Sequence, residues 1–176
     1  MFSEEQQFIA LKAKILKDRG LDCAQYKTNY LKRRIAVRMR AHVVESYREY
    51  MKILVVDDKE DSRVLVGKIL RLRGYEVIGA GTGEDAVSMA QTELPDLILM
   101  DIRLPGGIDG LEATRRIKAL PQLAHIPILA MTASVRPEDM QRALGEGCSG
   151  FVRKPIDIDE LPKEVAEHIA HASSTD

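Results

Sequence analysis

Five polar residues stand at or just beyond the ends of four short apolar runs, and their types suit phosphoryl transfer. They are Asp57, Asp58, Asp101, Thr132 and Lys154. A carboxylate can attack phosphorus, while an ammonium and a hydroxyl can hold the charged oxygens of the phosphoryl group. Any one of these residues alone is more simply explained as a turn former, a helix cap or a solvated side chain. Their occurrence together at corresponding positions favours one shared site.

This group of residues also predicts a bound divalent cation. Three carboxylates in one crevice repel one another, which raises their pKa values unless a cation joins them. Ligands that are all oxygen favour Mg²⁺, which takes one or two carboxylates together with phosphate oxygens. Asp101 is the best nucleophile candidate because it stands apart from the pair formed by Asp57 and Asp58. Its product would be an acyl phosphate.

Strand-like and helical patterns alternate from residue 52 onward. The predicted strands are residues 52–58, 75–80, 96–100, 126–131 and 151–152. The predicted helices are residues 62–73, a helix capped by Thr82 that ends before Pro95, and residues 111–120, 137–146 and 158–169. This alternation predicts an α/β fold, with a five-stranded parallel sheet and helices on both faces. The carboxyl ends of such strands share one crevice, where ligands bind.

The first fifty residues differ in charge and pattern. Residues 1–50 contain 11 Lys and Arg against 6 Asp and Glu, whereas residues 51–176 contain 15 against 21. Apolar residues at helical spacing predict a small α-helical segment there. We therefore divide the chain into a basic helical segment (1–50), an α/β domain (51–172) and a disordered tail (173–176).

The composition excludes some classes of protein. Apolar residues make up 45% and charged residues 30% of the chain, which is typical of a globular protein and not of a disordered one. No apolar run approaches the roughly 18 residues of a membrane span, and the first residues lack a signal-peptide core. We expect a cytoplasmic protein that does not bind membranes, with Cys23 and Cys148 as reduced thiols.

Residues 52–170 resemble the receiver domain of two-component response regulators. The motifs that carry the resemblance are Leu54-Val55-Val56-Asp57-Asp58, Leu97-Ile98-Leu99-Met100-Asp101-Ile102-Arg103-Leu104-Pro105, Ala130-Met131-Thr132-Ala133 and Lys154-Pro155. The resemblance implies a flavodoxin-like, doubly wound sheet of strand order 2-1-3-4-5. It also implies that Asp101 receives phosphate from the phosphohistidine of a histidine kinase or phosphotransfer protein. The domain would catalyse only its own phosphorylation and dephosphorylation, and it would act on a downstream protein target.

The same resemblance assigns roles to single residues. Asp58, Asp101 and the backbone carbonyl of Arg103 would bind Mg²⁺, with Asp57 acting through water. Thr132 and Lys154 would contact the phosphoryl group, and the Lys154-Pro155 peptide would be cis. Phosphate would draw Thr132 inward and Phe151 would follow, although a plain core Phe is an equally good reading.

Two departures from the family concern the surroundings of the site. Phe151 stands where Tyr is commoner, so a switch there would act by packing alone. The loop at residues 105–110 is one residue longer than usual, and its extra glycine should loosen it. The side chain of Arg103 could screen the phosphoryl group from water or point into solvent.

The first fifty residues resemble the helical N-terminal region of chemotaxis receptor methyltransferases. Nothing like a methyl-donor-binding domain follows, so we expect no methyltransferase activity. Arg33, Arg34 and Arg38 could dock a partner protein, pair two copies into a homodimer, bind nucleic acid, or form a solvated face on a helix packed against the receiver. Nucleic acid is disfavoured because no helix-turn-helix pattern is present.

Two other functions compete with the receiver interpretation. A phosphatase of the aspartyl-phosphate type would need a second acid two residues after its nucleophile, to act as general acid. Arg103 occupies that position, which argues against such an enzyme. A scaffold that works without phosphorylation is disfavoured because all five site residues are present.

Overall fold

The computed structural model of the protein describes residues 51–134 and 136–172. The helical predictions for residues 1–50 lie outside the described residues, as do the expected tail at 173–176 and the partner-binding candidates Arg33, Arg34 and Arg38.

Five parallel strands form one sheet in the order β2-β1-β3-β4-β5, as expected. The strands are β1 (Lys52–Val56), β2 (Glu76–Ala80), β3 (Leu97–Asp101), β4 (Ile128–Thr132) and β5 (Gly150–Arg153). Parallel pairing brings all five carboxyl ends to one edge of the sheet. That edge is where the five candidate residues were predicted to gather.

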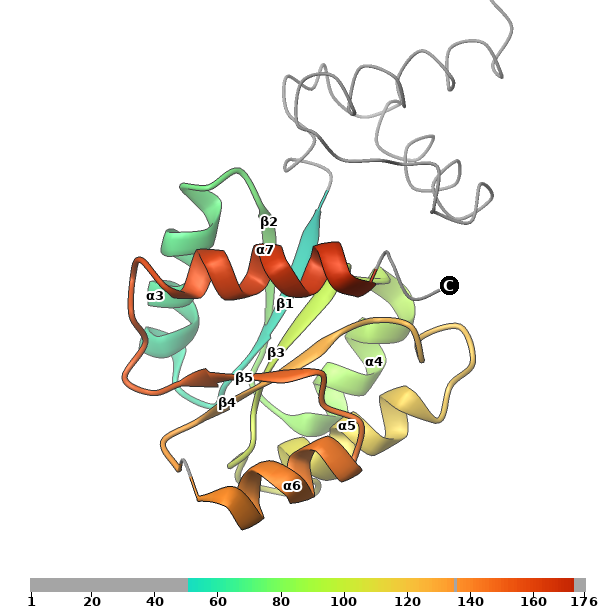
Figure 1. Ribbon diagram of the computed structural model, residues 1–176. Coiled ribbons are helices and arrows are strands. Elements are labelled where there is room, and N and C mark those ends of the chain that lie inside the picture. Colours follow the sequence, from blue (N-terminus) through green and yellow to red (C-terminus); the bar gives the residue numbers. More distant parts are fainter. Residues whose placement is uncertain (1–50, 135, 173–176) are drawn as a thin grey trace, which may run out of the picture.

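Helices cover both faces of the sheet (Figure 1). They are α3 (Glu60–Arg71), α4 (Gly83–Glu93), α5 (Gly110–Lys118), α6 (Pro137–Gly145) and α7 (Leu161–Ala172). Helices α3 and α7 lie on one face, and α4, α5 and α6 lie on the other. This arrangement confirms the predicted doubly wound α/β architecture.

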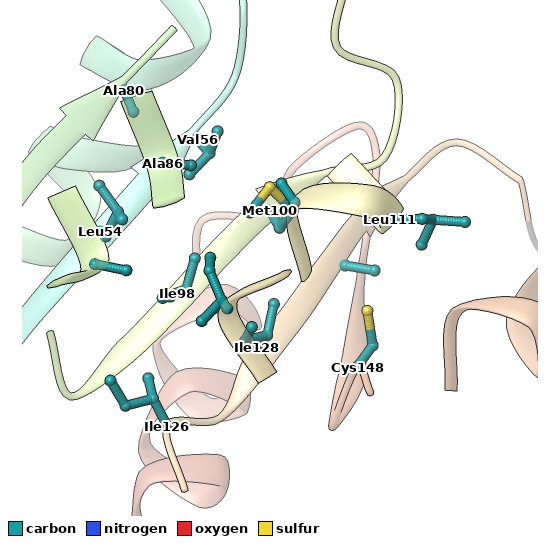
Figure 2. Packing of buried hydrophobic residues seen from close by; sticks show 14 of the residues in the cluster. Leu54, Val56, Ala80, Ala86, Ile98, Met100, Leu111, Ile126, Ile128 and Cys148 are labelled. Atoms are coloured by element: carbon teal, nitrogen blue, oxygen red, sulfur yellow. The ribbon is translucent and has the colours of Figure 1, made fainter. Parts of the chain in front are cut away.

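The strand side chains alternate between two buried cores, one on each face. The core under α4, α5 and α6 takes Leu54, Val56, Ile98, Met100, Ile128 and Ala130 (Figure 2). The core under α3 and α7 takes Ile53, Val55, Leu97, Leu99, Leu129 and Met131. Because successive strand residues point to opposite faces, the core residues of each strand show on which face the residue at its carboxyl end lies. Asp57 and Asp101 lie on the face covered by α3 and α7, whereas Thr132 lies on the face covered by α4, α5 and α6.

The observed element boundaries differ from the predicted ones by up to three residues. Helix α7 begins at Leu161 and not at residue 158, because the Asp157 side chain accepts the backbone N–H groups of Asp159 (2.8 Å) and Glu160 (3.0 Å) in a preceding turn. The predicted cap at Thr82 is confirmed, since its hydroxyl accepts the Asp85 N–H at 3.1 Å. Asp101 is the last residue of β3 itself and does not follow it.

Candidate functional site

Asp57, Asp101 and Lys154 meet at the carboxyl edge of the sheet. The Lys154 ammonium donates to Asp57 Oδ2 at 2.7 Å and to Asp101 Oδ2 at 2.5 Å. All three residues follow the strand positions that face α3 and α7, since Lys154 comes two residues after Val152 of that core. The long lysine side chain therefore reaches past the end of β4 to the ends of β3 and β1.

The Asp57 carboxylate is fully buried, and its partners keep it ionised. It accepts hydrogen bonds from Lys154, from Ser62 Oγ (2.7 Å) and from the Lys59 backbone N–H (2.9 Å). Burial alone raises the pKa of Asp57, but these bonds outweigh it and hold the pKa below its ordinary value. Burial likewise lowers the pKa of Lys154, and the carboxylates of Asp101 and Asp57 raise it above its ordinary value.

Asp58 completes a cluster of three carboxylates suited to a hard cation. One oxygen from each of Asp57, Asp58 and Asp101 lies within 4.8 Å of the others. Opposite ligands of an octahedral Mg²⁺ are about 4.2 Å apart, so adjustments of less than about 1 Å would bring these oxygens into coordination range. The cluster offers only oxygen donors, which fits Mg²⁺. Its three carboxylates face a single lysine charge, so a net negative charge remains for a cation to neutralise.

Thr132 lies at the same edge but on the other face of the sheet. Its hydroxyl accepts the Ser134 N–H at 3.0 Å and donates to the Ser134 carbonyl at 3.3 Å. The Ser134 hydroxyl in turn donates to Asp139 of α6 at 2.6 Å. Phe151 is half-buried opposite Ala130, on the same face as Thr132. Hydrogen bonds thus connect Thr132 through Ser134 to α6. The switch through Phe151 stays a prediction.

The loop after β3 is shaped by close contacts that exclude side chains. Gly106 has φ 104°, a conformation that L-residues rarely adopt, and a Cβ on Gly110 would collide with the carbonyl oxygen of Asp101. The Arg103 backbone N–H donates to Asp101 Oδ1 at 2.9 Å, while its side chain is exposed. That side chain lines a surface depression of about 540 Å³ together with Ala133, Ser134, Arg136 and Asp139.

The peptide bond between Lys154 and Pro155 is cis, as the resemblance implied.

Three residues that contact the site were not expected from the sequence: Ser62, Arg63 and Ser134. Ser62 and Arg63 come four to six positions after Asp57 and Asp58. Their place in the first turn of the next helix is the feature of the sequence that could have indicated them.

The comparisons with known proteins agree with this geometry. The model of the response regulator receiver domain family matches residues 53–166. The polar-differentiation response regulator DivK of Brucella ovis is 34% identical over 120 residues, which are 68% of this chain and 97% of that protein.

Two solved structures illustrate the likeness in fold. The chemotaxis response regulator CheY4 of Vibrio cholerae has a TM-score of 0.64 at 31% identity, covering 67% of this chain and 98% of that one. The receiver domain of the sensor histidine kinase PA1611 of Pseudomonas aeruginosa has a TM-score of 0.63 at 34% identity, covering 68% and 97%. The latter was solved with a magnesium ion coordinated in its active site cleft.

A second family model, the all-alpha domain of CheR methyltransferases, matches residues 6–69 and confirms the predicted N-terminal resemblance. The match runs on into β1 and α3. None of the helices in the described residues has the length and apolar character needed to cross a membrane.

The receiver family model covers most of the chain, and the DivK relative is matched over nearly its whole length. This protein therefore belongs to the response regulator receiver domain family.

Proposed function

We propose that Asp101 accepts a phosphoryl group, in a Mg²⁺-dependent reaction, from the phosphohistidine of a histidine kinase or phosphotransfer protein in the cytoplasm. The observation that carries the proposal is the Lys154 ammonium, which contacts both Asp57 and Asp101 beside a third carboxylate. The side chains that phosphoryl transfer needs thus converge at one edge of the sheet. Arg103 stands where a phosphatase of the aspartyl-phosphate type would need its general acid, so the protein would act as a switch and not as a turnover enzyme.

In the transfer, an oxygen of Asp101 attacks phosphorus and forms an O–P bond. The P–N bond to the donor imidazole breaks, and its electron pair leaves with the nitrogen. Lys154 neutralises negative charge on the phosphoryl oxygens, for which its ammonium is already placed 2.5 Å from Asp101 Oδ2. Asp58, Asp101 and the Arg103 carbonyl would hold Mg²⁺, with Asp57 acting through water, and the ion when bound supplies further neutralisation of phosphoryl charge.

The response to phosphorylation would begin at Thr132. Its hydroxyl would exchange its bonds to the Ser134 backbone for one to a phosphoryl oxygen, because a charged acceptor binds more strongly than a neutral carbonyl. Ser134 is bonded to Asp139, so the exchange would shift the start of α6. Phe151 lies beside this path on the same face and would repack as Thr132 moves.

The output of the switch would be a changed protein contact. The downstream target could be a separate protein, or the basic segment could transmit the change through docking or homodimer formation by Arg33, Arg34 and Arg38. Neither route requires nucleic acid.

Incubation with acetyl phosphate and Mg²⁺, followed by intact-mass measurement, tests the proposal. We expect one phosphoryl group to be added to the protein and no addition to Asp101→Asn. Arg115→Gln, which changes an exposed residue of α5, is the matched control and should be phosphorylated normally. Rapid multiple turnover of acetyl phosphate without an adduct would contradict the switch and favour the phosphatase.

A further inference from the structure

Arg63, in the first turn of α3, lies against the main chain just beyond β1. Its Nη1 atom donates to the carbonyl oxygen of Asp57 at 2.6 Å and to that of Asp58 at 3.2 Å. In a regular strand, successive carbonyl groups point in opposite directions. Here two consecutive carbonyls turn toward one nitrogen, so the guanidinium fixes the direction in which the chain leaves the strand.

The Asp58 carboxylate depends on this main-chain geometry. The Asp57 carboxylate has three hydrogen-bond donors of its own, from Lys154, Ser62 and Lys59. The Asp58 side chain is exposed, and within residues 51–134 and 136–172 no hydrogen bond reaches its carboxylate. Its direction toward Asp101 therefore follows from the orientation of its own backbone, which Arg63 holds.

Two glycines at the end of β2 make room for the arginine. A Cβ on Gly79 would lie 3.4 Å from Arg63 Cδ, and one on Gly81 would lie 3.6 Å from Arg63 Nη1. Gly79 pairs with Val55 in the sheet, so the arginine stem passes over the end of β2 to reach the chain after β1. A Cβ at position 79 would already touch that stem, so the two further methyl groups of a valine would crowd it without altering any charge.

We infer that Arg63 is a positioning residue for the divalent cation: by holding the Asp57 and Asp58 carbonyls it aims the Asp58 carboxylate into the site. The inference rests on the proposed function, because it concerns the Mg²⁺ that function requires. Arg63 itself would contact neither the phosphoryl group nor the cation.

The sign of one measurement separates this role from plain electrostatics. Arg63 carries a positive charge close to a site for a dication, and like charges repel. If charge were its only influence, removal of the guanidinium would tighten Mg²⁺ binding. If Arg63 positions Asp58, removal would weaken binding, since groups that orient metal ligands typically contribute about tenfold or more to affinity.

The experiment is calorimetric titration of Mg²⁺ into the full chain and its variants. We expect Arg63→Met to raise the dissociation constant about tenfold, and Arg63→Lys, which can reach a carbonyl with a single ammonium, to raise it less. Gly79→Val should weaken binding in the same direction with the arginine still present. Arg71→Met is the matched control, because Arg71 of the same helix also donates to a main-chain carbonyl, that of Val77 at 2.9 Å, and should leave the dissociation constant unchanged.

The rate of phosphorylation by acetyl phosphate provides a second readout. For Arg63→Met, the Mg²⁺ concentration at half-maximal rate should rise about tenfold, while the rate at saturating Mg²⁺ should stay within about twofold of the unmodified protein. A general structural defect would instead lower the saturating rate as well.

Two results would overturn the inference: unchanged or tighter Mg²⁺ binding by Arg63→Met, or unchanged binding by Gly79→Val. If Arg63→Met does not fold, as judged by its thermal unfolding transition, Gly79→Val decides alone. Absence of Mg²⁺ binding by the unmodified protein is a different result, which would refute the proposed function itself.

Discussion

Among the described residues, two clusters in which one lysine contacts two carboxylates lie at opposite edges of the same sheet. Lys154 contacts Asp57 at 2.7 Å and Asp101 at 2.5 Å at the carboxyl edge. Lys52 contacts Glu93 at 2.6 Å and Glu76 at 3.3 Å at the amino edge. The lysines differ little in burial, but the carboxylates of the first cluster are 0% and 12% exposed and those of the second are 41% and 44% exposed.

The difference shows that contact distance alone does not mark a functional site. Exposed ion pairs are screened by water and contribute little, whereas a buried carboxylate depends strongly on its partner. The carboxyl-edge cluster also includes Asp58, so that one oxygen from each of three carboxylates lies within 4.8 Å of the others. Burial and the convergence of three carboxylates, and not the lysine bridge, distinguish the two clusters.

The largest expected difference between the clusters is in phosphorylation. Lys154→Met should slow phosphorylation by acetyl phosphate about 100-fold, because it removes a charge that stabilises the transition state. Lys52→Met should leave the rate within about twofold, since its ammonium lies at the far edge of the sheet. Intact-mass time courses would measure both, and equal losses would contradict the comparison.

The next effect is on stability without Mg²⁺. Lys154→Met leaves the fully buried Asp57 carboxylate without its ion pair, and we expect a loss of about 2 kcal/mol. This is below the usual range for a buried pair because Lys154 is a quarter exposed and Ser62 still donates to Asp57. Lys52→Met should cost less than about 1 kcal/mol. Urea unfolding of both variants in EDTA would test the ranking.

Mg²⁺ should stabilise the protein through one cluster only. At a concentration about ten times the dissociation constant, the ion should add about 1.4 kcal/mol to the free energy of unfolding. Asp58→Asn should lose most of this increment and Glu93→Gln should retain it, because only Asp58 belongs to the carboxyl-edge group. Thermal unfolding with and without Mg²⁺ would reveal a shared response if both clusters bind the ion.

The smallest effect is the pH dependence of the Lys154 contribution. The lowered pKa of Asp57 stabilises the folded state above the ordinary value of 3.8, and this stabilisation is lost as pH falls through the folded pKa. The raised pKa of Lys154 stabilises below 10.5 and is lost as pH rises through its folded pKa. The stability gap between the unmodified protein and Lys154→Met should therefore narrow below about pH 4 and above about pH 10.5. A gap that is constant from pH 3 to pH 11 would show that the ion pair is not its cause.

The sequence predicted the sheet and its polar edge because short apolar runs and the residues that end them are local signals. The strand order was implied by resemblance and then confirmed. Local signals could not show that one ammonium joins Asp57 to Asp101, since that depends on how far a side chain reaches across β4. The first turn of the next helix is a local signal for Arg63, but its two main-chain contacts also depend on the space beside Gly79 and Gly81. The predicted start of α7 was three residues early because an Asp at position 157 looks like a helix cap in sequence. In the structure its side chain accepts hydrogen bonds within a turn that precedes the helix.

The alternation of strand side chains has a consequence for how such a protein can diversify. Asp57, Asp101 and Lys154 emerge on the side of α3 and α7, while Thr132 and Phe151 emerge on the side of α4, α5 and α6. The sheet thus divides the place where the signal would be received from the surface where it would be read. Substitutions that adapt the second surface to a new target can accumulate without altering the chemistry of the first.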